Sequence, residues 1–181
     1  AFLENTQKDE LEKLTKRGDD WQRKILERYD RLVKKYGLLY LLNFLNRPEA
    51  QTLMGQHWQI LPNGWAWLYR LGQTLQLDEN DPLIDFICQQ LGFDSHSELE
   101  QLAPLPAADK LEALAKRWYA KTDVWHPQLL KLDARIEFNP SHLDLHTNIN
   151  HVQLAVRLAG LDINPGWLPW LGRVVSFHYD T

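Results

Sequence analysis

Apolar residues recur at helical spacing through the first two thirds of the chain, and this pattern predicts a series of helices. Residues 1–17 are highly charged and have only a narrow apolar stripe, which predicts a thin helical extension. After Gly18 a second helix is predicted to residue 36, with apolar residues three or four positions apart: Trp21, Ile25, Tyr29, Leu32 and Tyr36. Its opposite face mixes basic and acidic residues, as is typical of a solvated helix surface.

The pattern then predicts a compact helical body. Residues 38–45 are apolar on all sides apart from Asn43, which predicts a central buried helix. Residues 49–62 are irregular, with one possible short helix. Further helices are predicted over 65–75, 82–91, 95–102 and 107–121, followed by a last turn or short helix at 126–132. Capping signals mark their ends, and in the helix over 107–121 the side chain of Trp118 is predicted to point inward.

Near the C-terminus the helical period gives way to strict alternation, which predicts strands over 135–138, 142–146 and 173–179. The Asn-Pro-Ser sequence at 139–141 has the chemistry of a tight turn between the first two strands. A short helix ending at Gly160 separates the second strand from the third. Alternation predicts that Leu143, Leu145 and Phe177 face the helices and that the histidines face water.

These elements together predict a predominantly helical α+β fold. Residues 1–17 are the charged N-terminal helical extension, and residues 19–132 are the helical body. Residues 133–181 are a hairpin, helix and strand unit that packs on this body and forms a small antiparallel sheet of about three strands.

Composition narrows the classes of function. The chain of 181 residues has a net charge of −4, which disfavours nucleic-acid binding because a duplex requires a basic surface. The longest apolar run is too short to span a bilayer, so membrane insertion is not expected. A single cysteine, Cys88, in an apolar helix indicates a reducing compartment, and we expect a cytoplasmic protein. The chain starts at Ala1 rather than Met, which suggests processing from a longer precursor.

One set of side chains has the chemistry of a metal site. His142, Asp144 and His146 alternate along one strand and therefore share a face, to which the last strand adds His178, with Ser176 as a further candidate. Imidazole and carboxylate groups suit zinc, and His151 is a further possible ligand. The simpler interpretation is a solvated sheet face, since a sheet covered on one side leaves its other side wet. We therefore expect no cofactor, and keep a zinc-dependent enzyme or metal-binding domain as the alternative.

Other catalytic signatures are missing from the sequence. It has no nucleophile elbow, no phosphate-binding loop and no dinucleotide-binding glycine pattern, so we expect no catalytic residues. The chain is instead rich in tryptophan, with 8 residues. Tryptophan is a frequent anchor of protein interfaces, and the candidates for partner binding are Trp21, Trp67, Trp167 and Trp170. The last two lie in a segment stiffened by proline, and we expect them to lock the terminal unit on the core unless either is exposed.

The segments LDLHTNINHVQLAVRLAGLDINPGWLPWLGRVVSFHY, YGLLYLLNFLN and GWAWLYRLGQTL together resemble the C-terminal region of uncharacterised bacterial proteins from gene clusters for phage-tail-like contractile injection systems. This resemblance implies an accessory or assembly component and brings no catalytic residues with it. The expected function is therefore a non-enzymatic scaffold or adaptor. It would bind a protein partner, or associate with itself, through its N-terminal helices and its tryptophan-bearing surface.

Overall fold

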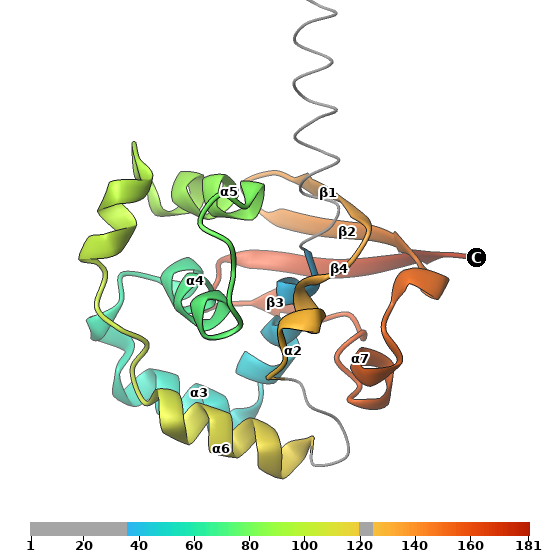
Figure 1. The fold of residues 1–181 in the computed structure, drawn as a ribbon, viewed down its shortest axis with the longest axis horizontal. Helices are drawn as coiled ribbons and strands as arrows, with labels where there is room; N and C mark the ends of the chain where they lie inside the picture. The colour runs from blue at the N-terminus through green and yellow to red at the C-terminus, as the bar shows by residue number, and fades with distance from the viewer. Residues whose placement is uncertain (1–35, 120–124) are drawn as a thin grey trace, which may run out of the picture.

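The computed structural model of the protein describes residues 36–119 and 125–181 (Figure 1). The helix predicted over 1–17, the helix predicted up to residue 36 and the candidate Trp21 lie outside these residues, except for Tyr36 itself. The described elements are η1 (Tyr36–Tyr40), α2 (Leu41–Leu45), α3 (Pro48–Gln56), η2 (Trp58–Ile60), α4 (Gly64–Thr74), α5 (Pro82–Leu91), η3 (His96–Gln101), α6 (Ala108–Trp118), η4 (Pro127–Leu130), β1 (Ala134–Phe138), β2 (His142–Asn148), η5 (Ile149–His151), α7 (Leu154–Leu158), β3 (Gly166–Leu168) and β4 (Arg173–Asp180).

The fold is α+β and dominated by helices, as predicted, but its sheet differs from the prediction. It has four strands in the order β1-β2-β4-β3, rather than about three. It is mixed rather than antiparallel, because β2 and β4 run parallel while the two outer pairs are antiparallel. A parallel pair requires a crossover, and η5, α7 and β3 supply it. Alternation along one strand does not specify the direction of its neighbour, which is why the pairing was wrong.

Local signals explain where the helices begin and end. The Asn63 side chain accepts hydrogen bonds from the backbone of Trp65 and Ala66 at the start of α4, at 3.0 and 3.2 Å. Asp81 caps α5 in the same way, and Gly92 ends that helix with a left-handed φ of 72°. Ser95 and Glu98 form the predicted capping box, although the segment that they begin, η3, is a 3₁₀-helix.

The centre of the molecule is the apolar segment formed by η1 and α2. All of its residues are buried except the half-buried Asn43, which confirms the predicted central element. The side-chain amide of Asn43 has hydrogen-bond partners within this apolar environment: it donates to the carbonyls of Leu161 and Ile163, each at 2.7 Å. This polar residue therefore ties the central segment to the turn between α7 and β3.

The inner face of the sheet packs on this central segment. Leu143, Leu145 and Phe177 are buried, as predicted, and the Phe177 ring lies edge-on to Tyr40 with a centroid distance of 5.0 Å. The hydroxyl oxygens of Tyr40 and Tyr179 are 3.2 Å apart, and Tyr179 donates to the Asp162 carbonyl at 2.6 Å. Burial raises the pKa of Tyr40 to about 12 and also raises that of Tyr179, so both phenols remain protonated donors at neutral pH.

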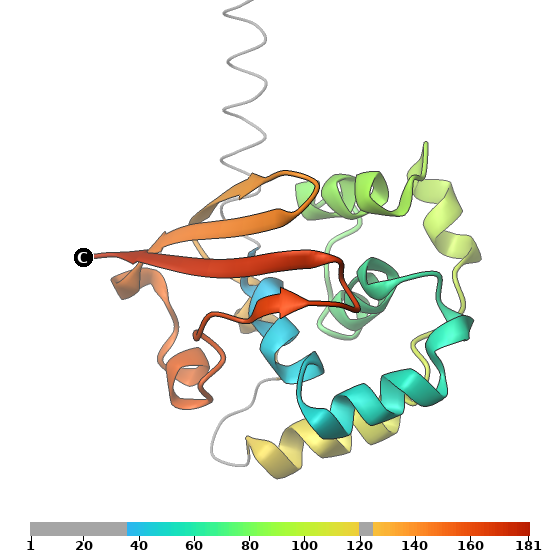
Figure 2. The same ribbon diagram turned by 180° about the vertical axis from the view of Figure 1, so that it is seen from behind.

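Viewed from behind, β3 lies in front of α2, and no described helix crosses the outer face of the sheet (Figure 2). Helices α4 and α5 lie on the far side, towards one end of the strands, whereas α7 lies at the opposite end (Figures 1 and 2). Among the described residues, no helix combines the length and apolarity that a bilayer crossing requires.

The close approach of Gly37 to η4 gives a first test of this packing. A Cβ atom at position 37 would lie 1.4 Å from the carbonyl oxygen of Leu129, and backbone cannot move aside as a flexible side chain does. We predict that Gly37→Ala lowers the free energy of unfolding in urea by more than about 2 kcal/mol. The control is Gly55→Ala in α3, where a Cβ meets nothing within 4 Å; it should leave stability unchanged or slightly higher. Equal effects of the two changes would contradict the packing described.

Candidate functional site

The outer face of the sheet carries the side chains that the sequence singled out. The register places His142 beside Val174, which pairs in turn with Trp167; it places Asp144 between Glu137 and Ser176, and His146 between Arg135 and His178. We call these nine residues the outer sheet face. Three of the four predicted metal ligands come from β2, and the fourth, His178, comes from β4. All four lie on one side of the sheet, because directly paired residues project on the same side.

Two histidines form the centre of this face. The rings of His146 and His178 are stacked, with centroids 4.6 Å apart and planes 15° from parallel. His178 Nε2 is 2.7 Å from Asp144 Oδ1, a hydrogen-bond distance, whereas His146 Nε2 is 3.5 Å from Glu137 Oε2. Arg135 completes the set with an ion pair to Glu137 at 3.0 Å. The polar side chains of this face therefore contact one another, across neighbouring strands at the histidines and within β1 at Arg135 and Glu137.

This arrangement bears on the zinc hypothesis. Among the described residues, no group of three His, Cys, Asp or Glu side chains is placed to hold a metal ion. The lone pair of an imidazole nitrogen lies in the plane of its ring, so two nearly parallel rings do not point at one shared ion. His142 lies near the hairpin turn, where its Nδ1 is 2.7 Å from Ser141 Oγ. Of the four candidate ligands, Asp144 and His146 thus each contact His178, whereas His142 contacts Ser141.

The tryptophans proposed as partner anchors have different environments. Trp67 is fully buried and stacks on Trp58, with a centroid distance of 6.4 Å, so its ring is part of the core and not of the surface. Trp170 is half-buried and donates from Nε1 to Asn46 Oδ1 at 3.0 Å, which locks the terminal unit on the body as predicted. Trp167 is 57% exposed on the outer sheet face. Of these three residues, Trp167 presents the most accessible anchor.

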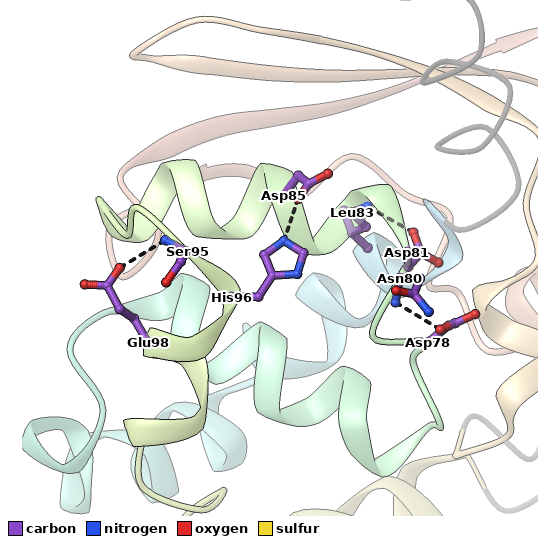
Figure 3. Close-up of polar contacts among 8 residues, drawn as sticks. All are labelled: Asp78, Asn80, Asp81, Leu83, Asp85, Ser95, His96 and Glu98. Atoms are coloured by element: carbon purple, nitrogen blue, oxygen red, sulfur yellow. Dashed lines mark hydrogen bonds and ion pairs between the residues drawn. The ribbon is translucent and has the colours of Figure 1, made fainter. Parts of the chain in front are cut away.

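A second candidate site, which the sequence did not indicate, is a hollow of about 480 Å³ beside α4, α5 and η3. His96 lines the hollow, and its Nε2 approaches Asp85 Oδ1, which lies outside the lining, at 2.5 Å (Figure 3). Both side chains are nearly half exposed, so water screens this pair and its contribution to stability is small. The contact joins η3 to α5.

The other polar groups of the hollow also serve the fold. Arg70 donates to the carbonyls of Leu99, Leu102 and Ala103 and thereby caps the end of η3. Ser97 Oγ is 2.7 Å from Ser95 Oγ, and so the hydroxyl beside His96 is paired with another hydroxyl and not with the imidazole. The hollow therefore has one lining histidine, His96, paired with a carboxylate outside the lining, and no activated nucleophile among the described residues. Spacing in the sequence gave no signal for it, because His96 and Asp85 belong to different helices.

A comparison of the chain with known proteins found no matching family model, no matching curated protein and no matching solved structure. The residues described above therefore carry the functional argument.

The stacked geometry of the two histidines leads to a prediction about zinc. We expect an equimolar addition of zinc to change the melting temperature of the chelator-treated protein by less than about 1 °C, because the ring nitrogens do not converge. The measurement is a thermal melt with and without zinc, with His178→Ala as the matched variant. A zinc-dependent rise of several degrees that His178→Ala abolishes would establish the metal-binding alternative.

Proposed function

We propose that the chain is a non-enzymatic scaffold or adaptor that acts through protein–protein contacts. The observation that carries this proposal is the clustering of exposed apolar side chains in the segment from α7 to β3. Seven large hydrophobic side chains in the described part of the chain are exposed, and four of them lie here: Leu154, Leu158, Ile163 and Trp167. We call residues 154–167 the α7–β3 segment.

Helix α7 turns part of its apolar surface to water. Its C-terminal end is a Schellman motif, in which Gly160 N–H bonds to the Arg157 carbonyl and Leu161 N–H to the Val156 carbonyl, each at 3.1 Å. Val156 and Leu161 are buried by this motif, whereas Leu154 and Leu158, one turn apart, are 67% and 69% exposed. A pair of leucines on the outward side of a helix is typical of a surface that binds a partner.

The α7–β3 segment is also held in place, which supports binding. Besides the two bonds from Asn43 and the bond from Tyr179, the Asn164 side chain accepts from the backbone N–H of Phe177 at 2.6 Å. Side chains on a fixed backbone lose little further conformational entropy when a partner binds. Trp167 belongs to the residue type most enriched among the energetic centres of interfaces.

Further parts of the proposal rest on the sequence alone. The N-terminal helices predicted within residues 1–36 provide a second route to a partner or to self-association, since the apolar stripe of residues 1–17 is narrow and has little to bury by itself. The resemblance to proteins of contractile injection clusters supports a role as an accessory or assembly component in bacteria. The single cysteine supports a cytoplasmic location.

The double change Leu154→Ser and Leu158→Ser tests the proposal. Because both side chains are exposed, we expect the free energy of unfolding to change by less than about 0.5 kcal/mol per site. We expect crosslinks from this segment to partner proteins, mapped by mass spectrometry on complexes from the native host, to be lost. The control Val156→Ser removes the buried neighbour and should destabilise the fold instead. Partner crosslinks that persist in the double variant, or that map only to other surfaces, would contradict the proposal.

A further inference from the structure

A cluster of arginine and aromatic side chains lies where the turn between α2 and α3 meets the end of α6. The Arg47 guanidinium lies over two rings, 4.8 Å from the centroid of Trp118 and 5.1 Å from that of Tyr119. Arg117 approaches the Trp118 ring at 5.9 Å. We call Arg47, Arg117, Trp118 and Tyr119 the arginine–tryptophan cluster.

The fold fixes the orientation of Arg47. The residue precedes Pro48 in an extended conformation, with φ −67° and ψ 145°, because proline excludes the helical conformation before it. Its Nε donates to the Tyr119 hydroxyl at 2.7 Å, and Tyr119 is itself buried edge-on to Phe44. A guanidinium that lies over two rings and donates through Nε is therefore held in a fixed position, and its two Nη groups remain as further donors.

Trp118 does not occupy the position that its spacing predicts. The apolar stripe of α6 placed its side chain inward, but the helix ends at Trp118 and the next residue, Tyr119, takes the buried position. The indole is instead 41% exposed, with a guanidinium contacting it from each of two elements. The prediction failed because the helix ends within the last turn of the pattern.

The hydrogen-bonding capacity of this cluster is largely unused. Within the described ranges, the Nη atoms of Arg47 form no hydrogen bond or ion pair, and the Arg117 guanidinium forms neither. The neighbouring Lys116 is paired with Glu112 at 3.3 Å, so among the described residues this carboxylate contacts the lysine and not Arg117. Two guanidinium groups whose donors have few partners among the described residues thus lie beside an exposed indole.

We propose that the arginine–tryptophan cluster is a docking site for an acidic protein segment, whose Asp or Glu carboxylates bind the two guanidinium groups. Charge complementarity supports this partner, because a planar guanidinium matches a carboxylate with two parallel hydrogen bonds. The neighbouring indole supplies apolar contact area for the partner's side chains, and Arg, Trp and Tyr are the residues that dominate interface energetics. This site uses residues other than those of the α7–β3 segment and does not depend on that segment being an interface.

Nucleic acid fits the cluster less well than an acidic peptide does. Affinity for a phosphate backbone comes from many basic side chains acting together, and the chain as a whole is net negative. The cluster has two guanidinium groups on a short stretch of surface, which suits one or two carboxylates of a peptide.

Fluorescence anisotropy with a fluorescein-labelled hexaglutamate peptide tests the proposal on the full chain. We expect saturable binding that weakens as salt is raised, and a loss of affinity of about tenfold for Arg117→Gln and for Arg47→Gln. Arg47→Lys keeps the charge but not the planar fork, and should bind about as weakly as Arg47→Gln. The matched control is Lys110→Gln, which removes an exposed positive charge from the same helix and should change affinity by less than about twofold.

Any one of three results would overturn the proposal. The first is no saturable binding of hexaglutamate, and the second is binding that both arginine variants retain in full. The third is tighter binding of a single-stranded oligonucleotide through the same arginines. Association of the chain with itself that the arginine variants abolish, measured by sedimentation, would assign the cluster to a second copy instead. Circular dichroism and urea unfolding establish that each variant is folded. If Arg47→Gln is destabilised, the Arg117→Gln variant decides the test, because the Arg117 side chain is exposed and makes no hydrogen bond with any described residue.

Discussion

The structure depends on the contact between the inner face of the sheet and the apolar segment formed by η1 and α2. This segment is buried along almost its whole length, and Tyr40 contacts Phe177 and Tyr179 on β4. On another side, the backbone of η1 approaches η4 so closely that only glycine fits at position 37. Strand and helix therefore share one core, and burial of this shared apolar surface is the main stabilising term.

This contact determines what the protein presents to solvent. Since the pleat of a strand alternates, seating Leu143, Leu145 and Phe177 on the core turns the histidines and carboxylates of the same strands outward. The crossover between β2 and β4 must then pass around the end of the sheet, and this places α7 at the periphery with Leu154 and Leu158 exposed. The outward histidines and the exposed leucines of the α7–β3 segment are consequences of one packing arrangement.

Local features of the fold were predictable from the sequence, whereas features set by distant parts of the chain were not. Asn63, Asp81 and Gly92 act on their own helices, so their roles follow from neighbouring residues alone. Strand β3 has only three residues between two prolines, too few for an alternating pattern. The parallel pairing of β2 with β4 was missed together with this strand. The same limit applies to the candidate site. Alternation identified the outward histidines, but the stacking of His146 on His178 depends on the register between two strands.

The exposure of the tryptophans illustrates the same limit. Trp67 lies off the apolar stripe of α4 and is nevertheless buried, because Trp58 stacks on its other face. Trp118 lies on the stripe of α6 and is exposed, because the helix stops there. In each case a residue outside the helix, or the end of the helix itself, decides which side chain is covered.

The central claim is that sheet and helices form one cooperative unit around the η1–α2 segment, and native-state hydrogen exchange tests it most directly. Amides in the centre of β2 and β4 and amides in α4 should exchange with the same opening free energy and the same dependence on denaturant, because opening either part exposes the shared core. Strand amides that exchange through an opening of clearly lower free energy than those of α4 would show that the sheet folds separately, and would contradict this account.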